Sequence, residues 1–180
     1  VDGVLQVARG TRWETIAADY PVEEQARMRT GEDSLVAFEL NGGVVIRANA
    51  DTEVVPMSIP SSPSEPWKLN LVRGELWAKV PGGGSGVEIT TASGRVVANQ
   101  GEVYVRAVPD SQVTQMLVLR GTALLTNDFD FDPQWATVGK EAVVRLAERP
   151  SQPTRFPNDR VRQVMWAYLP REHSRGHQQG

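Results

Sequence analysis

The stretch LVRGELW, residues 71–77, decides the fold, and VLRGTAL, residues 118–124, repeats its plan. In each stretch a run of strand-forming residues reaches an Arg-Gly pair, ending at Gly74 or Gly121, and resumes at once. Glycine inside a strand pattern marks a bulge, a tight bend or a close approach of two backbones. The two units therefore predict short strands that fold over on one another.

Strand signals continue on both sides of these units, separated by turns every ~8–12 residues, which is typical of all-β sandwiches and related folds. No helical window separates the strands, which excludes an alternating βαβ fold. We expect a β-sandwich or β-roll. A short solenoid stays open, because the two Arg-Gly units recur after about 47 residues. Glycines are expected at turns or bends at six positions: Gly31, Gly42, Gly74, Gly94, Gly121 and Gly139.

Two strand assignments and one turn follow from the same pattern. Residues 67–80 are expected to form a strand pair hinged at Gly74. Residues 95–98 and 102–108 are expected to form two separate strands. The Asn41-Gly42-Gly43 sequence predicts a hairpin turn, because its glycines adopt positive φ angles at no steric cost.

The composition of the chain changes near its end, and this change sets the predicted domain boundaries. Residues 1–147 form the all-β domain, 148–170 a linker with a short C-terminal helix, and 171–180 a disordered tail. Asn158 is the expected N-cap of a helix over 159–169. Its apolar residues recur at helical spacing: Val161, Val164, Met165 and Tyr168. We favour packing of this helix on the sandwich over a docking or dimerising role.

Composition narrows the function. The 180 residues carry a formal net charge of −3, which gives no cationic footprint for nucleic acid. The absence of cysteine excludes disulfides, iron–sulfur clusters and thiol catalysis. No window approaches the ~18 apolar residues of a membrane span. Because the first residue is Val1, we expect an N-terminal signal or anchor to have been removed, which would be the chain's sole link to a membrane.

The titratable residues give little support for catalysis. His173 and His177 lie in the polar tail, so we expect no metal site there and no serine hydrolase or cupin-type enzyme in the β region. Glu75 and Glu102 could serve glycoside hydrolysis if the fold held them at the right separation. Surface glutamates in turns are far commoner, so we expect no enzyme and no cofactor.

The segment DFDFD, residues 128–132, alternates carboxylates with phenylalanines. Carboxylates at this spacing open many calcium loops, but Pro133 stands where an EF-hand needs glycine. We favour an amphipathic edge segment with both phenylalanines buried, whose charges discourage strand-to-strand aggregation.

Tryptophans are the candidate contact residues. Trp77 lies in mid-strand and is expected in the core. Trp67 follows Pro66 and Trp135 adjoins the acidic segment, so both are expected at the surface. An exposed indole can anchor a protein partner or stack on a sugar ring. The predicted binding residues are Trp67, Trp135 and Trp13.

The order of several motifs over residues 3–146 resembles the FecR domain. Similar segments stand at these positions: Gly3-Val4, Thr30-Gly31-x-Asp33-Ser34, Phe38-x-Leu40-x-Gly42, Leu69-x-Leu71-x-Arg73-Gly74-Glu75-Leu76-Trp77, Ile89-x-Thr91-x-x-Gly94, Leu117-x-Leu119-x-Gly121 and Val138-Gly139-Lys140-Glu141. Ala92 replaces the proline of the family's Thr-Pro-x-Gly step. The Gly-Thr pair that usually follows is missing, because this region reads Asn99-Gln100-Gly101-Glu102.

The resemblance implies an extracytoplasmic all-β module of the periplasm or cell surface that receives a signal and regulates a sigma factor. The expected function is therefore non-enzymatic protein binding in envelope signalling or envelope assembly, with an envelope protein as partner. A cell-surface module that binds carbohydrate or peptidoglycan is the alternative. Neither the ligand nor the oligomeric state follows from the sequence.

Overall fold

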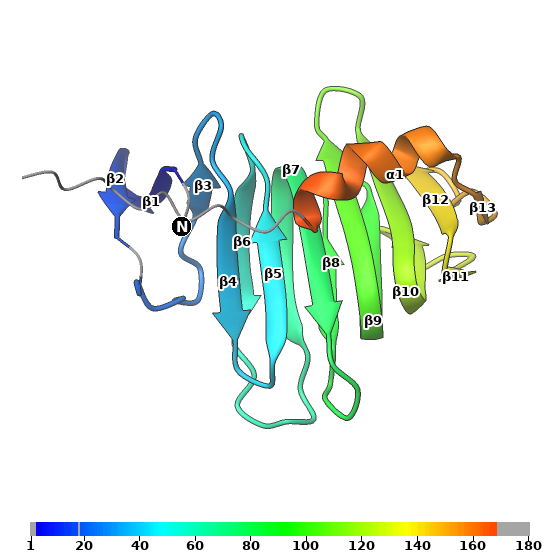
Figure 1. Ribbon diagram of the computed structural model, residues 1–180, viewed down its shortest axis with the longest axis horizontal. Helices are drawn as coiled ribbons and strands as arrows, with labels where there is room; N and C mark the ends of the chain where they lie inside the picture. The colour runs from blue at the N-terminus through cyan, green and yellow to red at the C-terminus, as the bar shows by residue number, and fades with distance from the viewer. Residues whose placement is uncertain (1–2, 18, 169–180) are drawn as a thin grey trace, which may run out of the picture.

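The computed structural model describes residues 3–17 and 19–168, and within them the fold is almost entirely β (Figure 1). Thirteen strands form one hydrogen-bonded sheet. They are β1 Leu5–Arg9, β2 Arg12–Ile16, β3 Met28–Thr30, β4 Val36–Leu40, β5 Val44–Ala48, β6 Glu53–Ser58, β7 Trp67–Val80, β8 Val87–Thr90, β9 Gly94–Val108, β10 Val113–Asn127, β11 Gln134–Thr137, β12 Lys140–Arg145 and β13 Thr154–Arg155. The expected all-β class is confirmed.

The sheet folds over into two layers, because β7, β9 and β10 are long, bent strands that contribute to both. What we call the helix-side layer contains, in order, β4, β5, residues 74–80 of β7, residues 101–108 of β9, residues 113–118 of β10, β12 and β13. The opposite layer contains β2, β1, β3, β6, residues 67–73 of β7, β8, residues 94–98 of β9, residues 122–127 of β10 and β11.

The bends in the long strands fall at glycines. Gly74, Gly101 and Gly121 have φ angles of +95°, +113° and +69°, a region that L-residues with a side chain rarely adopt. The backbones also approach closely: a Cβ added at Gly74 would stand 2.3 Å from the Thr52 hydroxyl oxygen. The chain therefore bends at Gly74 and Gly121, but residues 67–80 form the single bent strand β7 and not the expected strand pair.

The bend at Gly101 was not predicted. Residues 95–98 and 102–108 belong to the single strand β9, so the expectation of two separate strands is wrong. Gln100 pairs in register with Thr122 of β10, and a register shift follows between Thr122 and Leu124, so the strand continues through these polar residues. The chain turns from one layer to the other without leaving the sheet.

Each Arg-Gly unit also places an arginine beside a buried carboxylate on the neighbouring strand. Arg73 is paired in register with Glu53, with 3.8 Å between Arg73 Nε and Glu53 Oε2. Arg120 is paired with Glu102, with 3.5 Å between Arg120 Nε and Glu102 Oε1. The two carboxylates are nearly buried, so the arginines offset much of the cost of removing these charges from water.

The main core lies between the two layers and follows the period of two expected for strands. Alternate residues point inward, as Trp67, Leu69 and Leu71 do on β7. The same layer-to-layer packing continues through Val103 and Val105 on β9. The two buried carboxylates, Glu53 and Glu102, lie beside the bends and pair with arginines there.

A short C-terminal segment crosses the outer face of the helix-side layer (Figure 1). It consists of α1, Asn158–Val164, and the 3-10 turn η1, Met165–Ala167. Pro157 is the N-cap, so the predicted cap at Asn158 is wrong. The expected packing on the sandwich is confirmed.

Of the predicted apolar stripe, Val164 is buried, whereas Val161, Met165 and Tyr168 are exposed. The 3-10 turn changes the rotation per residue after Val164. This brings Trp166 and Ala167 toward the sheet instead. No described helix has the length and apolarity that a membrane crossing needs.

The other predicted turns can be placed individually. Gly42 and Gly139 have positive φ angles at hairpin turns, and nothing within 4 Å of either would meet an added Cβ. Gly94 lacks a positive φ, but an added Cβ would stand 2.3 Å from the Thr126 carbonyl oxygen. Gly31 also lacks a positive φ, and its role is tighter packing near Ser34.

Candidate functional site

The three tryptophans predicted as contact residues lie in three different environments. Trp67 is 4% exposed, so the expectation that it lies at the surface is wrong. Trp135 is 60% exposed on β11. Trp13 is half-buried on β2, with the guanidinium carbons of Arg29 and Arg27 at 4.0 and 5.5 Å from its ring centroid.

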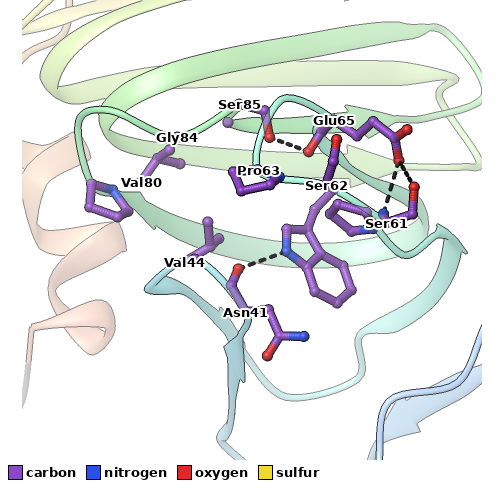
Figure 2. A pocket seen from close by; sticks show the side chains of 14 residues that line it. Asn41, Val44, Ser61, Ser62, Pro63, Glu65, Val80, Gly84 and Ser85 are labelled. Atoms are coloured by element: carbon purple, nitrogen blue, oxygen red, sulfur yellow. Dashed lines mark hydrogen bonds between the residues drawn. The ribbon is translucent and has the colours of Figure 1, made fainter.

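Trp67 instead forms part of a pocket at one end of the two layers (Figure 2). The pocket has a volume of about 240 Å³. The indole Nε1 of Trp67 donates a hydrogen bond to the Asn41 carbonyl oxygen at 3.0 Å. Pro60, Pro63 and Pro81 supply apolar walls. The ring is thus fixed as a wall of the pocket.

Polar groups gather at the rim of this pocket. Glu65 Oε2 accepts hydrogen bonds from the Ser61 backbone N–H and hydroxyl, both at 2.9 Å. These bonds are the main reason that the pKa of Glu65 is lowered. The Ser85 hydroxyl donates to the Glu65 carbonyl oxygen, and Figure 2 places Ser85 and Asn41 on opposite sides of the opening. The pocket combines apolar walls with hydroxyl, amide and carboxylate groups.

A second built surface lies under the C-terminal segment. A straight row of paired residues crosses five strands of the helix-side layer: Arg47, Trp77, Tyr104, Leu117 and Glu141. We call it the outer row. Trp77 is buried as predicted, but on this outer face and not between the layers.

The C-terminal segment contacts the outer row along its whole length. Arg160 lies 3.7 Å from Glu141. The ring centroid of Trp166 lies 6.4 Å from that of Tyr104 in an edge-to-face arrangement. At the other end, Arg47 donates a hydrogen bond to the Ala167 carbonyl oxygen. The segment therefore clamps five strands together.

The two tyrosines of this interface have raised pKa values. Burial, followed by the nearby Glu75 carboxylate, raises the pKa of Tyr104. Tyr168 is 45% exposed, and the partial burial of its hydroxyl end, followed by the Glu102 carboxylate, raises its pKa to about 12. Trp77 Nε1 and Glu102 Oε2 are buried without a full hydrogen bond, and the Tyr168 hydroxyl lies within electrostatic reach of both groups. The Tyr168 hydroxyl therefore stays protonated and offers a polar group to Trp77 Nε1 and Glu102 Oε2.

Glu75 and Glu102 share the outer face of the helix-side layer. Glu75 stands opposite Arg106, and Glu102 stands opposite Lys79. Their backbone positions are therefore four residue steps apart along the strands, about 13 Å at ~3.3 Å per residue. Glycosidases hold their carboxyl pairs at roughly 5–9.5 Å. Each carboxylate also faces an arginine, at 3.8 Å for Glu75 and 3.5 Å for Glu102.

The acidic segment 128–132 is a loop between β10 and β11, and it does not bury its phenylalanines. Phe129 is 73% exposed and Phe131 is 54% exposed, so the expectation of buried rings is wrong. Asp130 pairs with Arg95 at 2.7 Å. The residues that the structure describes contain no His, Asp or Glu cluster that could hold a metal ion, and His173 and His177 lie outside them.

Comparison with known families decides the classification. The sequence model of the FecR protein family matches residues 26–124, more than half of the chain. The chain belongs to the FecR family. The match covers β3 to the second half of β10 and therefore both Arg-Gly bends. It ends before the exposed aromatic loop, β11 and the C-terminal segment.

Solved structures support the same fold. Two crystal structures, each of a proposed anti-sigma factor from Parabacteroides distasonis ATCC 8503, are similar at 14% identity. Their TM-scores are 0.64 and 0.63, over 77% and 78% of this chain. The matches span 63% and 64% of those chains. No curated protein sequence matches this one.

Two features of these surfaces were missed from the sequence. The outer row was not predicted, although Trp77, Tyr104 and Leu117 are apolar residues on the strand face opposite the core, a signal that something covers them. The pocket was not predicted because it forms from three loops that are distant in sequence, at residues 41–44, 60–67 and 80–86.

Proposed function

We propose that this FecR-family chain is a partner-binding module of a regulator that controls a sigma factor. It binds a protein, carries out no catalysis and works outside the cytoplasm. Its membership of the FecR family is the observation that carries the proposal. The likeness to proposed anti-sigma factors supports it at the level of the fold.

The chemistry of the described residues is consistent with binding. Glu75 and Glu102 stand too far apart for the usual carboxylate pair of a glycosidase and are paired with arginines. Large apolar side chains are exposed on one hairpin, as expected of a docking surface. The C-terminal segment clamps five strands of the helix-side layer, which would hold the module rigid while a partner binds.

The test is a genetic one in the source bacterium. Deletion of the gene should change transcription from promoters of one alternative sigma factor, and the full-length protein should restore it. A Trp135→Ala protein should restore it less well if the exposed hairpin carries the partner. Unchanged transcription from all such promoters after deletion would contradict the proposed function.

The pocket at Trp67 favours a second candidate, binding of a cell-wall sugar. Its apolar walls and the amide, hydroxyl and carboxylate groups at its rim would contact the C–H face and the hydroxyls of a sugar ring in a cavity of about 240 Å³. Titration with soluble peptidoglycan fragments, followed by the Trp67 indole N–H resonance, tests it. An unmoved resonance at saturating fragment concentration would remove this candidate.

A further inference from the structure

The hairpin β10–β11 and the turn after it expose large apolar side chains that the fold does not use. Four of them are more than half exposed: Phe129 at 73%, Val138 at 61%, Trp135 at 60% and Phe131 at 54%. We call residues 128–138 the β11 surface. A soluble domain rarely leaves so many large apolar groups together in water unless another molecule covers them.

The loop that carries the phenylalanines is held in a defined shape. The side-chain oxygen of Asn127 accepts hydrogen bonds from the backbone N–H groups of Phe129 and Phe131, at 3.1 and 2.8 Å. Its amide nitrogen donates to the Glu148 carbonyl oxygen at 3.3 Å. The rings are therefore presented to solvent in advance, which lowers the entropic cost of covering them.

Next to this loop lies an unpaired strand edge. Among the described strands β11 pairs with β10 alone, through Gln134–Thr137, and its other edge carries no partner. An open edge offers backbone N–H and C=O groups to an incoming extended segment. Trp135 lies in the middle of this strand, so a strand added there would pass beside its indole.

The chemistry of the incoming segment follows from what the surface already binds. The Arg149 guanidinium lies 4.8 Å from the Phe131 ring centroid and 4.0 Å from an Asp132 oxygen. One arginine thus contacts an aromatic face and a carboxylate together. Asp128 directly precedes the exposed Phe129, so a carboxylate and an aromatic ring adjoin here too, and within the described residues Asp128 makes no salt bridge. An arginine of a partner protein could contact Phe129 and Asp128 in the way that Arg149 contacts Phe131 and Asp132.

A second copy of this chain is a poor source of that arginine. The other free edge of the opposite layer is β2, beside Arg9. Arg9 already faces Glu14 and Glu23 at 3.7 and 3.8 Å. Nearby, Arg27 and Arg29 lie on the Trp13 ring. Arg12 on β2 is exposed and makes no salt bridge among the described residues, but a copy that placed β2 beside β11 would repeat head to tail into an open fibre. A different protein is therefore the better match.

We propose that the β11 surface binds an extended, arginine-bearing segment of a partner protein, added as a strand beside β11. The inference rests on the proposed function, since it names the surface and partner chemistry of the same module. The exposed rings supply apolar contact, the β11 edge supplies backbone hydrogen bonds, and Asp128 selects arginine.

The probe is a short synthetic peptide of alternating arginine and valine, titrated into the isotope-labelled chain and followed by NMR. We expect the amides of residues 128–138 and the Trp135 indole to shift. Trp135→Ala and Phe129→Ala should each weaken binding by about tenfold. Met57→Ala, at an exposed apolar residue of β6 in the same layer, is the matched control and should bind as the wild type does. Circular dichroism of every variant reports whether it is folded.

Two altered peptides separate the parts of the proposal. Citrulline in place of arginine removes the charge, and N-methylation of alternate amides removes the strand pairing. Each change should weaken binding by about tenfold. Equal affinity for the arginine and citrulline peptides would overturn it. So would shifts confined to the β2 edge or to the Trp67 pocket, or self-association through residues 128–138.

The two proposals fail in different ways. Loss of peptide binding with intact sigma-factor control would overturn the β11 inference and leave the proposed function standing. Peptide binding at β11 without any sigma-dependent change on gene deletion would overturn the proposed function and leave the surface assigned.

Discussion

Gly74 stands where the chain passes from one layer to the other, and two separate physical demands meet there. Its φ angle of +95° disfavours any side chain, and an added Cβ would stand 2.7 Å from the Thr52 Cα and 2.3 Å from its hydroxyl oxygen. The nearest atoms include backbone, so the neighbouring strand must move. We expect Gly74→Ala to lower the free energy of unfolding by about 2–4 kcal/mol.

Gly42 has the positive φ angle but not the close contact, so it serves as the comparison for Gly74. It has φ +84° at a hairpin turn, with nothing within 4 Å of an added Cβ. Gly42→Ala should therefore cost about 1 kcal/mol, the backbone contribution alone. Urea unfolding of both variants is the measurement. Equal losses of stability would show that the close approach at the bend contributes nothing.

The two Arg-Gly units differ in how well their buried carboxylate is paired. Glu53 has a second arginine, because Arg27 Nε donates to its Oε1 at 3.0 Å. Glu102 has an ion pair with Arg120 alone among the described residues. Arg120→Ala should therefore destabilise the protein by about 1 kcal/mol more than Arg73→Ala, since it leaves a buried charge without its arginine. Urea midpoints of the two variants decide this.

At the scale of the element, the C-terminal segment is held by few buried side chains. Val164 is fully buried against Tyr104 and Leu117, whereas most of α1 is exposed. Val164→Asp would put a charge into this contact. We expect amide exchange in α1 to speed up at least tenfold, while exchange in the core of β9 stays slow.

If Val164→Asp instead speeds up amide exchange equally throughout the sandwich, the prediction is wrong. That would make the segment part of the main folding unit and not a clamp added to it. Val161→Asp is the matched control, because Val161 lies on the same helix and is 40% exposed. It should change exchange little.

The pH dependence of the clamp follows from Tyr168. Its pKa is raised from 10.0 to about 12, chiefly by burial and then by Glu102. A raised pKa means that the neutral phenol stabilises the fold below pH 10, and this stability is lost as the pH rises to about 12. Wild-type protein should lose stability over this window relative to Tyr168→Phe. Parallel curves for the two proteins would contradict the assignment.

The sequence predicted those elements whose signals are local. Gly74 and Gly121 interrupt clear strand patterns, so their bends could be located. Gly101 follows the polar residues Asn99 and Gln100, which hid the continuity of β9. Trp67 was misplaced because the adjacent proline outweighed the period of two that it shares with Leu69.

The candidate surfaces were harder to predict, because they depend on packing between distant segments. The prediction that the apolar helical stripe continues beyond Val164 is wrong, because a 3-10 turn changes the rotation per residue there. No residue type in that segment predicts this turn. The prediction that Phe129 and Phe131 are buried is wrong, because hydrogen bonds to the Asn127 side chain, and not strand pairing, shape their loop. Family resemblance supplied the class correctly, and residues 128–138 lie outside the matched region.

At the scale of the whole molecule, the two layers share three continuous strands, and the exposed aromatic hairpin stands at one end of the opposite layer. A partner strand added to β11 would extend that layer without disturbing the core between the layers. The module would thus bind as a rigid body, with the C-terminal segment clamped on the other face (Figure 1).

The most direct test of this account is site-specific photo-crosslinking in the source cells. A photo-reactive phenylalanine analogue replaces Trp135 on β11 and, in a separate protein, Thr15 on β2. We predict that position 135 yields a covalent adduct with one distinct partner protein and that position 15 does not. An adduct from position 15 with none from position 135 would contradict the account.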